Sequence, residues 1–168
     1  MEIRLLEEID MPQFWTLWVR ALRDHPTAFG ASYAWAKEVS AEQAQEILRQ
    51  IRSAGGFILG ALDQQRPIGW VSFTRQQSEK FRHKGDMGAI YVVPEARGRG
   101  IAKTMLTTAL ERTQEMADVA LITLSVNNEN LSARRLYETC GFRAYGIEPM
   151  GISVDGQYFD LLHMTYQR

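Results

Sequence analysis

Short apolar runs alternate with longer amphipathic segments through most of this sequence. Residues 57–62 and 68–74 are apolar runs with β-branched and aromatic side chains, and the mostly polar residues 63–67 between them predict a hairpin. Residues 151–156 begin and end with glycine, which predicts a turn region before the last strand. The pattern predicts strands at 2–6, 57–62, 68–74, 86–93, 119–126, 142–147 and 158–166.

Two amphipathic helices are predicted in the first third of the chain. The first begins at Asp10, whose carboxylate can cap a helix, and it has an apolar face that includes Trp18. The second begins with a capping box of Ser40 and Gln43 and continues to about Ser53. Both helices are long enough to cover part of a sheet.

Two further helices are predicted in the second half. One follows Gly100 and carries Ile101 and Met105 at a spacing of four, so its apolar face is expected to lie on the sheet. The other covers 130–140 and ends at Gly141, since glycine commonly terminates helices. The periodicity therefore predicts an alternating α/β pattern.

Length and composition predict one domain over residues 1–168. The chain contains 45% hydrophobic and 23% charged residues, which is ordinary for a globular protein. The first ten residues include acidic side chains where a secretory signal needs an apolar segment, and no run approaches the roughly 20 apolar residues of a membrane span. We therefore expect a cytoplasmic protein without a membrane partner.

The charge and the cysteine content exclude other classes. A net charge of −1 provides no basic surface for nucleic acid, so no nucleic-acid partner is expected. No metal site is expected either. Cys140, the single cysteine, cannot form an internal disulfide, which fits a reducing compartment. Because it ends a predicted helix, where small buried residues are usual, a covalent catalytic role for its thiol is disfavoured.

Residues 91–105 run from an apolar strand through a glycine-rich turn directly into a helix. Gly98 and Gly100 allow backbone conformations that side chains disfavour. The unpaired N–H groups at the start of the helix point outward with the positive end of the helix dipole. This order predicts an anion site of the kind that binds a pyrophosphate.

Other interpretations of the glycine turn differ in their spacing. A P-loop needs four residues between its glycines, whereas Gly98 and Gly100 are separated by one. A dinucleotide-binding fingerprint needs a third glycine at the position of Lys103. A plain strand-to-helix turn with glycines for tight packing stays open on this segment alone.

Two segments in the second half of the chain resemble a known family. The segment with Arg97, Gly100 and Ala102 resembles the coenzyme A signature of the GCN5-related N-acetyltransferase (GNAT) family. Residues 125–142, with an asparagine, a Leu-Tyr pair and a terminal Gly-Phe, resemble the second motif of that family. Two motifs in this order are more specific than either alone, and the resemblance is strong over residues 57–164.

The resemblance implies both a fold and an activity. The implied fold is α/β (α+β), a mixed, mostly antiparallel sheet of six to seven strands with a central pair of parallel strands that splay apart, flanked by about four helices. The implied activity is direct transfer of an acetyl group from acetyl-CoA, in a ternary complex, to a primary amine of a small molecule or amino-acid-like acceptor. Two alternatives stay open: a non-catalytic acyl-CoA-binding or regulatory module, and an enzyme that acetylates a protein or peptide amine. Homodimers through the C-terminal strands are common in the family.

By resemblance, acetyl-CoA would be held by the strand before the turn, by the turn itself and by the second motif. The N–H of Val92 or Val93 would donate to the carbonyl oxygen as it gains charge. The backbone of 91–93 would pair with the pantetheine amides, and Pro94, which lacks an N–H, would end that pairing. The implied cofactor-binding residues are Tyr91, Val92, Val93, Arg97, Gly98, Arg99, Gly100, Ile101, Ala102 and Asn130.

Tyr137 matches the tyrosine of the family's second motif and is the predicted catalytic general acid. A phenol is protonated at neutral pH and can donate to the thiolate of coenzyme A when the two groups are close. Tyr137 could instead be a packed aromatic whose hydroxyl finds a surface partner. Asn130 can cap the predicted helix, contact pantetheine, or do both.

The third requirement is a proton acceptor, because an alkylamine is mostly protonated at neutral pH. Family members that modify ribosomal-protein N-termini carry a glutamate where this chain has Ser125, which argues against a protein N-terminus as the acceptor. His83 lies in a basic run that is expected to be a solvated loop. The acids that could act directly or through water, or simply be solvated surface groups, are Glu79, Asp86, Glu148 and Asp160. The aromatics that could line an acceptor pocket or fill the core are Trp15, Trp18, Phe29, Tyr33, Trp35 and Trp70.

Overall fold

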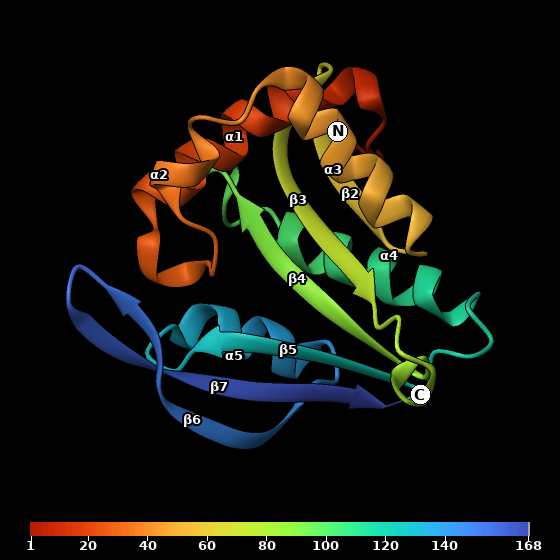
Figure 1. Cartoon of the computed structure of the whole chain (residues 1–168), viewed down its shortest axis with the longest axis vertical. Helices are drawn as coiled ribbons and strands as arrows, with labels where there is room; N and C mark the ends of the chain where they lie inside the picture. The colour runs from red at the N-terminus through yellow and green to blue at the C-terminus, as the bar shows by residue number, and fades with distance from the viewer. Residues whose placement is uncertain (168) are drawn as a thin grey trace.

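The structure, a computed structural model, describes residues 1–167 and contains a seven-stranded sheet with helices packed on it (Figure 1). The strands are β1 (Glu2–Leu5), β2 (Phe57–Asp63), β3 (Arg66–Arg75), β4 (Lys84–Val92), β5 (Leu121–Asn127), β6 (Arg143–Val154) and β7 (Gln157–Gln167). The α-helices are α1 (Met11–Asp24), α2 (Tyr33–Ala36), α3 (Ala41–Ser53), α4 (Ile101–Gln114) and α5 (Leu131–Thr139).

The strand order is β1-β2-β3-β4-β5-β7-β6. Every neighbouring pair is antiparallel except the central pair, β4 and β5, which is parallel. The helix α4 makes the crossover between these two strands, as parallel pairs require. The mixed, mostly antiparallel sheet with a central parallel pair is thus confirmed.

The strands β4 and β5 are paired only at one end. Their register joins residues 84–86 to residues 121–123, and beyond that point the strands diverge (Figure 1). β4 also contains a bulge, because its register with β3 gains one residue between Met87 and Ile90. A Cβ at Gly88 would lie 2.3 Å from Oγ of Ser72, so a larger residue in this bulge would force the Ser72 hydroxyl to move. The bulge and the divergence together part the sheet at its centre.

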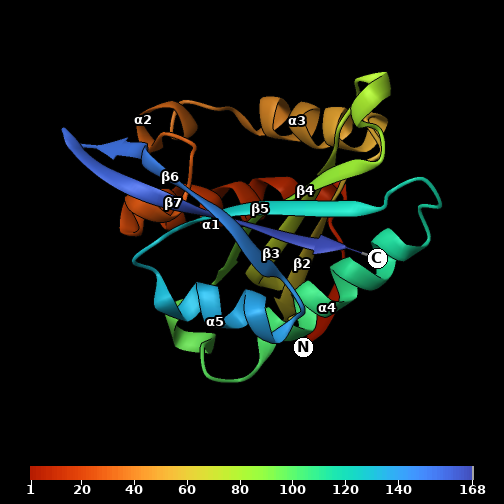
Figure 2. The ribbon, with the colours of Figure 1, turned by 90° about the horizontal axis from the view of Figure 1, so that it is seen from below.

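Successive residues of β3 face opposite layers of the molecule. Trp70 packs edge-to-face on Phe14 of α1, with ring centroids 5.4 Å apart. A Cβ at Gly69 would lie 3.1 Å from Cε of Met105 in α4. Because side chains alternate along a strand, α1 and α4 cover opposite faces. Figure 2 shows the same layering, with α3 on one side of the sheet and α4 and α5 on the other.

The C-terminal hairpin differs from the prediction. A strand at 142–147 and a turn at 151–156 were predicted, but β6 continues to Val154. Gly151 lies inside this strand. Leu161 of β7 packs so closely against it that a Cβ at residue 151 would be 2.8 Å from Cγ of Leu161. The turn prediction was therefore wrong at this glycine, which serves a close approach between strands.

Two smaller differences concern the ends of elements. The strand predicted from residue 119 begins at Leu121, because the N–H of Val119 bonds to the carbonyl of Met116 in the preceding turn. The single-turn helix α2, capped by Ser32, was not predicted. Within residues 1–167 the structure contains no helix long and apolar enough to cross a membrane.

Candidate active site

The glycine turn begins where β4 ends, and its conformation explains its sequence. Gly98 has φ of 77° and Gly100 has φ of 75°, both in the left-handed region that side chains disfavour. Nothing lies within 4 Å of the position that a Cβ would take at either residue. The backbone conformation, rather than packing, requires these glycines, and the surface beside them is open.

The helix α4 starts directly after the turn with its first N–H groups outside the helical ladder. The N–H of Thr104 donates to the carbonyl of Gly100 at 3.0 Å, so residues 101–103 precede the first intrahelical bond. The first turn of α4, all of which the structure describes, has no acidic side chain and instead carries Lys103. A cation is disfavoured at a helix N-terminus, so Lys103 is a further sign of the predicted anion site. Sequence analysis did not include Lys103 among the site residues.

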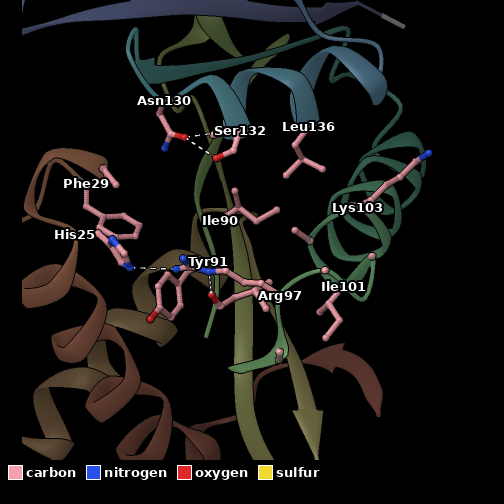
Figure 3. Close-up of a pocket in the computed structure, with 17 residues that line it drawn as sticks. His25, Phe29, Ile90, Tyr91, Arg97, Ile101, Lys103, Asn130, Ser132 and Leu136 are labelled. Carbon is pink, nitrogen blue, oxygen red and sulfur yellow. Dashed lines mark hydrogen bonds between the residues drawn. The ribbon is translucent and has the colours of Figure 1, made fainter. Parts of the chain in front are cut away.

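The turn opens onto a cavity of about 490 Å³, which we call the turn pocket (Figure 3). Its walls come from the end of β4, the glycine turn, the start of α4, the start of α5 and the segment after α1. All predicted cofactor residues line it except Val93 and Arg99. The lining residues are His25, Ala28, Phe29, Ile90, Tyr91, Val92, Ala96, Arg97, Gly98, Gly100, Ile101, Ala102, Lys103, Asn130, Ser132, Ala133 and Leu136.

Arg97 is held at the edge of the turn pocket by three neighbours (Figure 3). Its Nε donates to the carbonyl oxygen of Val92 at 3.0 Å, and its Nη2 lies 3.1 Å from Nε2 of His25. Its guanidinium carbon also lies 5.7 Å from the ring centroid of Tyr91, within cation–π range. Sequence analysis missed His25, because only the fold brings the end of α1 beside the turn.

The backbone of β4 alternates between β3 and the turn pocket. The N–H of Val93 donates to the carbonyl of Ile68 at 2.9 Å, so Val93 faces β3. Because hydrogen-bonded pairs alternate in an antiparallel ladder, Tyr91 also bonds to β3, and the N–H groups of Val92 and Ile90 face away from it. The expected N–H donor at Val92 or Val93 therefore narrows to Val92. The N–H of Ile90, a residue that was not predicted, also faces the turn pocket, whereas the backbones of Tyr91 and Val93 bond to β3.

Asn130 is the N-cap of α5. Its Oδ1 accepts hydrogen bonds from the N–H of Ala133 at 3.1 Å and from the hydroxyl of Ser132 at 2.9 Å. The capping interpretation of Asn130 is thus confirmed. Its amide nitrogen lies on the other side of the side chain, at the wall of the turn pocket (Figure 3). The same residue can therefore cap the helix and donate to a ligand.

A second cavity of about 560 Å³, the sheet pocket, lies where β4 and β5 diverge. Residues shared by the two linings, such as Ile90 and Asn130, show that the pockets meet. The sheet pocket is lined by Trp18, Ala28, Phe29, Gly30, Asp86, Met87, Gly88, Ala89, Ile90, Thr123, Leu124, Ser125, Val126, Asn127, Asn130, Ala133, Tyr137, Tyr145 and His163.

Tyr137 projects from α5 into the lining of the sheet pocket. Only 6% of its surface is exposed, and its ring packs edge-to-face on Phe142 with centroids 5.9 Å apart. Burial raises the pKa of the Tyr137 phenol well above its usual range, since the charged form is disfavoured away from water. The Tyr137 hydroxyl therefore stays protonated at neutral pH.

A hydrogen-bonded chain of three side chains lies at the edge of the sheet pocket. Oγ of Ser125 in β5 is 2.8 Å from Nδ1 of His163 in β7. Nε2 of His163 is 2.8 Å from Oε2 of Glu148 in β6. Sequence analysis missed His163, because the register of β5 with β7, which sets these residues opposite one another, is not visible in the sequence.

The other acids considered as proton acceptors are in different surroundings. Asp86 lines the sheet pocket, but its carboxylate accepts hydrogen bonds from Thr123 and Gln76. Asp160 accepts the N–H of Met150 at 3.0 Å and so stabilises the C-terminal hairpin. The remaining groups, Glu79, His83 and Cys140, line neither pocket.

The aromatic residues divide between core and pocket. Trp18 and Phe29 line the sheet pocket, with ring centroids 5.7 Å apart. Trp70 is fully buried beneath them and packs against Trp18 at 5.2 Å. Trp15 packs on Trp35 at 5.9 Å outside both pockets. Trp15 and Trp70 are therefore core residues, Trp18 and Phe29 line the pocket, and Tyr33 and Trp35 are exposed, so each of the two interpretations holds for only part of the set.

Comparison with known proteins agrees with this architecture. The model of the acetyltransferase (GNAT) family matches residues 13–142. The spermidine N(1)-acetyltransferase of Vibrio cholerae is 33% identical over 82 residues, and the match spans 49% of this chain and 47% of that protein, about half of each.

Solved structures show the same fold. The ribosomal-protein-alanine N-acetyltransferase of Brucella melitensis superposes with a TM-score of 0.88 at 24% identity and 100% coverage of both chains. A phosphinothricin acetyltransferase of Sinorhizobium meliloti, in complex with AcCoA, has a TM-score of 0.85 at 18% identity, with 99% of this chain and 87% of that chain covered.

The fold and the matched region define a protein of the acetyltransferase class. The chain belongs to the acetyltransferase (GNAT) family. This confirms the resemblance and the fold that the two sequence motifs predicted.

Proposed function

We propose that this protein is an N-acetyltransferase that moves the acetyl group of acetyl-CoA to a primary amine of a small molecule or amino-acid-like acceptor. Residues 1–168 would act as one catalytic domain. The observation that carries the proposal is that the turn pocket and the sheet pocket meet between β4 and β5. One side of this space presents the open N–H groups of α4, and the other side presents Tyr137.

The turn pocket would hold the phosphates and the pantetheine arm of acetyl-CoA. The N–H groups of residues 101–103 and the charges of Arg97 and Lys103 suit a pyrophosphate. The outward backbone groups of Ile90 suit a pantetheine amide, which would pair with β4 as an added strand. The family and the AcCoA complex of the Sinorhizobium meliloti relative support this choice of cosubstrate.

The chemistry follows from the position of each group. A neutral amine would attack the acetyl carbonyl, whose oxygen would receive the N–H of Val92 as its charge grows. The sulfur of coenzyme A would leave with the phenol proton of Tyr137, which burial keeps on the oxygen until that step. Direct attack in a ternary complex needs no covalent enzyme intermediate.

A small amine is the acceptor that the sheet pocket suits best. Its lining combines the rings of Trp18, Phe29 and Tyr145 with the polar groups of Ser125 and Asn127. Two similar proteins carry the names of spermidine and phosphinothricin, both small molecules with an amine. These comparisons support the substrate class.

We further propose a homodimer formed through the C-terminal strands. β6 is an edge strand of the sheet, so one side of its backbone is open to pair with a second copy. Its exposed apolar side chains outside the two pockets, together with one from β7, are Ile147, Met150 and Tyr158. An isologous pairing of two β6 strands would cover this surface.

The test of the activity is release of coenzyme A from acetyl-CoA with a panel of amino acids, polyamines, aminoglycosides and short peptides. Product mass identifies the acetylated amine, and a Cys140→Ala variant removes the protein's own thiol from the assay. Release that depends on a small amine supports the proposal. Release only with peptides favours the peptide acetyltransferase, and bound acetyl-CoA without release favours the non-catalytic module.

A further inference from the structure

The Ser125–His163–Glu148 chain joins three neighbouring strands at the open edge of the sheet pocket. Ser125 and His163 line the pocket, and Glu148 stands behind His163. The side chain of His163 is 25% exposed and that of Glu148 is 52% exposed. The chain therefore runs from the pocket towards solvent, as a route for a proton requires.

The direction of each hydrogen bond follows from what its partners can donate. A carboxylate only accepts, so Nε2 of His163 must carry the hydrogen that bonds to Glu148. In a neutral imidazole, Nδ1 is then the acceptor, and Ser125 must donate its hydroxyl hydrogen to it. The lone pairs of the Ser125 oxygen are left to accept from a group in the pocket.

We propose that His163 accepts the proton of the acceptor ammonium through Ser125, while Glu148 stabilises the imidazolium that forms. This inference rests on the proposed N-acetyltransferase function. His163 thus supplies the proton acceptor. Ser125, which stands where some relatives have a glutamate, cannot take this role by itself.

The proton balance is complete with these groups. The ammonium gives one proton to Oγ of Ser125 as the Ser125 hydroxyl proton moves to Nδ1 of His163, so the serine is unchanged and the amine is neutral. After attack, Tyr137 protonates the leaving sulfur and recovers a proton from the new amide nitrogen. The imidazolium of His163 then releases the first proton to solvent.

The other titratable groups near His163 do not replace it as the proton acceptor. From β6, Tyr145 stacks on the imidazole with ring centroids 5.9 Å apart. From β4, Asp86 is tied to Gln76 and Thr123 across the pocket. From α5, Tyr137 is a phenol that burial keeps protonated, so it has no lone proton-accepting charge. Glu148 is thus the carboxylate that contacts the imidazole.

The test combines kinetics with NMR of the histidine rings. The chain has three histidines, so a ¹⁵N-histidine spectrum of the whole protein contains three imidazoles. We compare the wild type with His163→Gln, Ser125→Ala and Glu148→Gln. The matched control is His83→Gln, which changes a histidine outside both pockets. The kinetic assay uses the best amine from the panel and measures kcat against pH at saturating acetyl-CoA.

The spectrum is expected to show His163 with its hydrogen on Nε2, and Ser125→Ala is expected to shift the Nδ1 signal. His163→Gln is expected to lower kcat on the order of 10²-fold and to remove the fall of kcat towards acid pH. Ser125→Ala is expected to lower kcat less than His163→Gln does, because a water can take the place of the hydroxyl. His83→Gln is expected to match the wild type.

Three results distinguish a failure of the proton relay from a failure of the proposed acetyltransferase function. A neutral His163 imidazole in the wild type that carries its hydrogen on Nδ1 and not on Nε2 overturns the relay whether or not the protein turns over. A His163→Gln variant with wild-type kcat and the wild-type pH profile also overturns it, while the acetyltransferase proposal stands. Absence of amine-dependent turnover in the wild type instead contradicts the proposed function itself.

Discussion

The guanidinium Nε of Arg97 donates to the carbonyl oxygen of Val92 at 3.0 Å, which ties the glycine turn to the end of β4. This bond uses the carbonyl of the same residue whose N–H faces the space between β4 and β5. Arg97 therefore links the predicted anion site to the backbone of Val92, the candidate oxyanion donor.

Replacement of Arg97 by alanine is expected to weaken acetyl-CoA binding. It removes a cation from the turn pocket and frees the carbonyl of Val92, so Kd should rise on the order of tenfold, the equivalent of one charge-assisted hydrogen bond. Calorimetric titration measures this. The control is Arg99→Ala, because Arg99 is exposed and outside the pocket. An equal loss of acetyl-CoA affinity in both variants would mean that the overall positive charge of the turn, and not Arg97 in particular, binds the phosphates.

Replacement of Gly100 by alanine is expected to weaken the cofactor site through the backbone. The φ of 75° costs a side chain about 1 kcal/mol, although the space around the position is open. We expect a lower melting temperature and weaker acetyl-CoA binding. Gly146→Ala is the control, since Gly146 has open space but is not among the glycines with positive φ. Unchanged affinity in Gly100→Ala would place the pyrophosphate elsewhere.

Replacement of Tyr137 by phenylalanine is expected to slow turnover and leave binding intact. The ring contact with Phe142 is kept, and only the proton donor is lost. We expect kcat to fall on the order of 10²-fold or more with an unchanged Kd for acetyl-CoA. Tyr166→Phe, which alters another ring beside Phe142 but outside both pockets, is the control. A wild-type kcat in Tyr137→Phe would remove this residue as the acid.

Asp10 and Arg4 are expected to make stability depend on pH. Two hydrogen bonds of 2.7 and 2.8 Å from Arg4 hold the pKa of the Asp10 carboxyl below its usual value. A lowered folded-state pKa adds stability above the unfolded value of about 3.9, and this stability is lost as pH falls through the folded value. Asp10→Asn should therefore unfold more easily than the wild type at pH 7, by about 1.5–3 kcal/mol.

Urea unfolding of both proteins from pH 7 down to pH 2 measures this difference. The gap between wild type and Asp10→Asn should narrow as the pH falls below the unfolded value. Asp155→Asn, a change in the exposed β6–β7 turn, should show no such gap. A constant gap at all pH values would mean that the carboxylate charge of Asp10 is not the source of the stability.

The edge strand β6 gives a prediction about assembly. Ile147→Glu places a charge among the exposed apolar side chains of β6 and is expected to convert a dimer into monomers. Light scattering after size-exclusion chromatography measures the mass. A wild-type protein that is monomeric at high concentration would contradict the proposed dimer.

Local patterns predicted most elements of the fold because they depend on neighbouring residues. The capping box of Ser40 and Gln43 begins α3 as expected, and Asn130 caps α5. The glycine turn was predicted for the same reason, since the φ values of Gly98 and Gly100 are properties of single residues. Gly151 was misread because its requirement comes from Leu161 on another strand.

The rest of the site depends on contacts between distant segments. His25 reaches Arg97 because α1 ends beside the glycine turn, and His163 reaches Ser125 through the register of β5 with β7. The N–H of Val92 faces away from β3 and that of Val93 does not, and this depends on which residues of β4 form hydrogen-bonded pairs with β3. None of these relationships leaves a local pattern in the sequence.

The most direct test of the central claim is transfer of a labelled acetyl group from acetyl-CoA to the amine panel, with the product identified by mass. The account predicts one acetyl group on a small primary amine for each coenzyme A released, with wild-type protein and far more slowly with Tyr137→Phe. Protein that binds acetyl-CoA but transfers the label to no amine would contradict it.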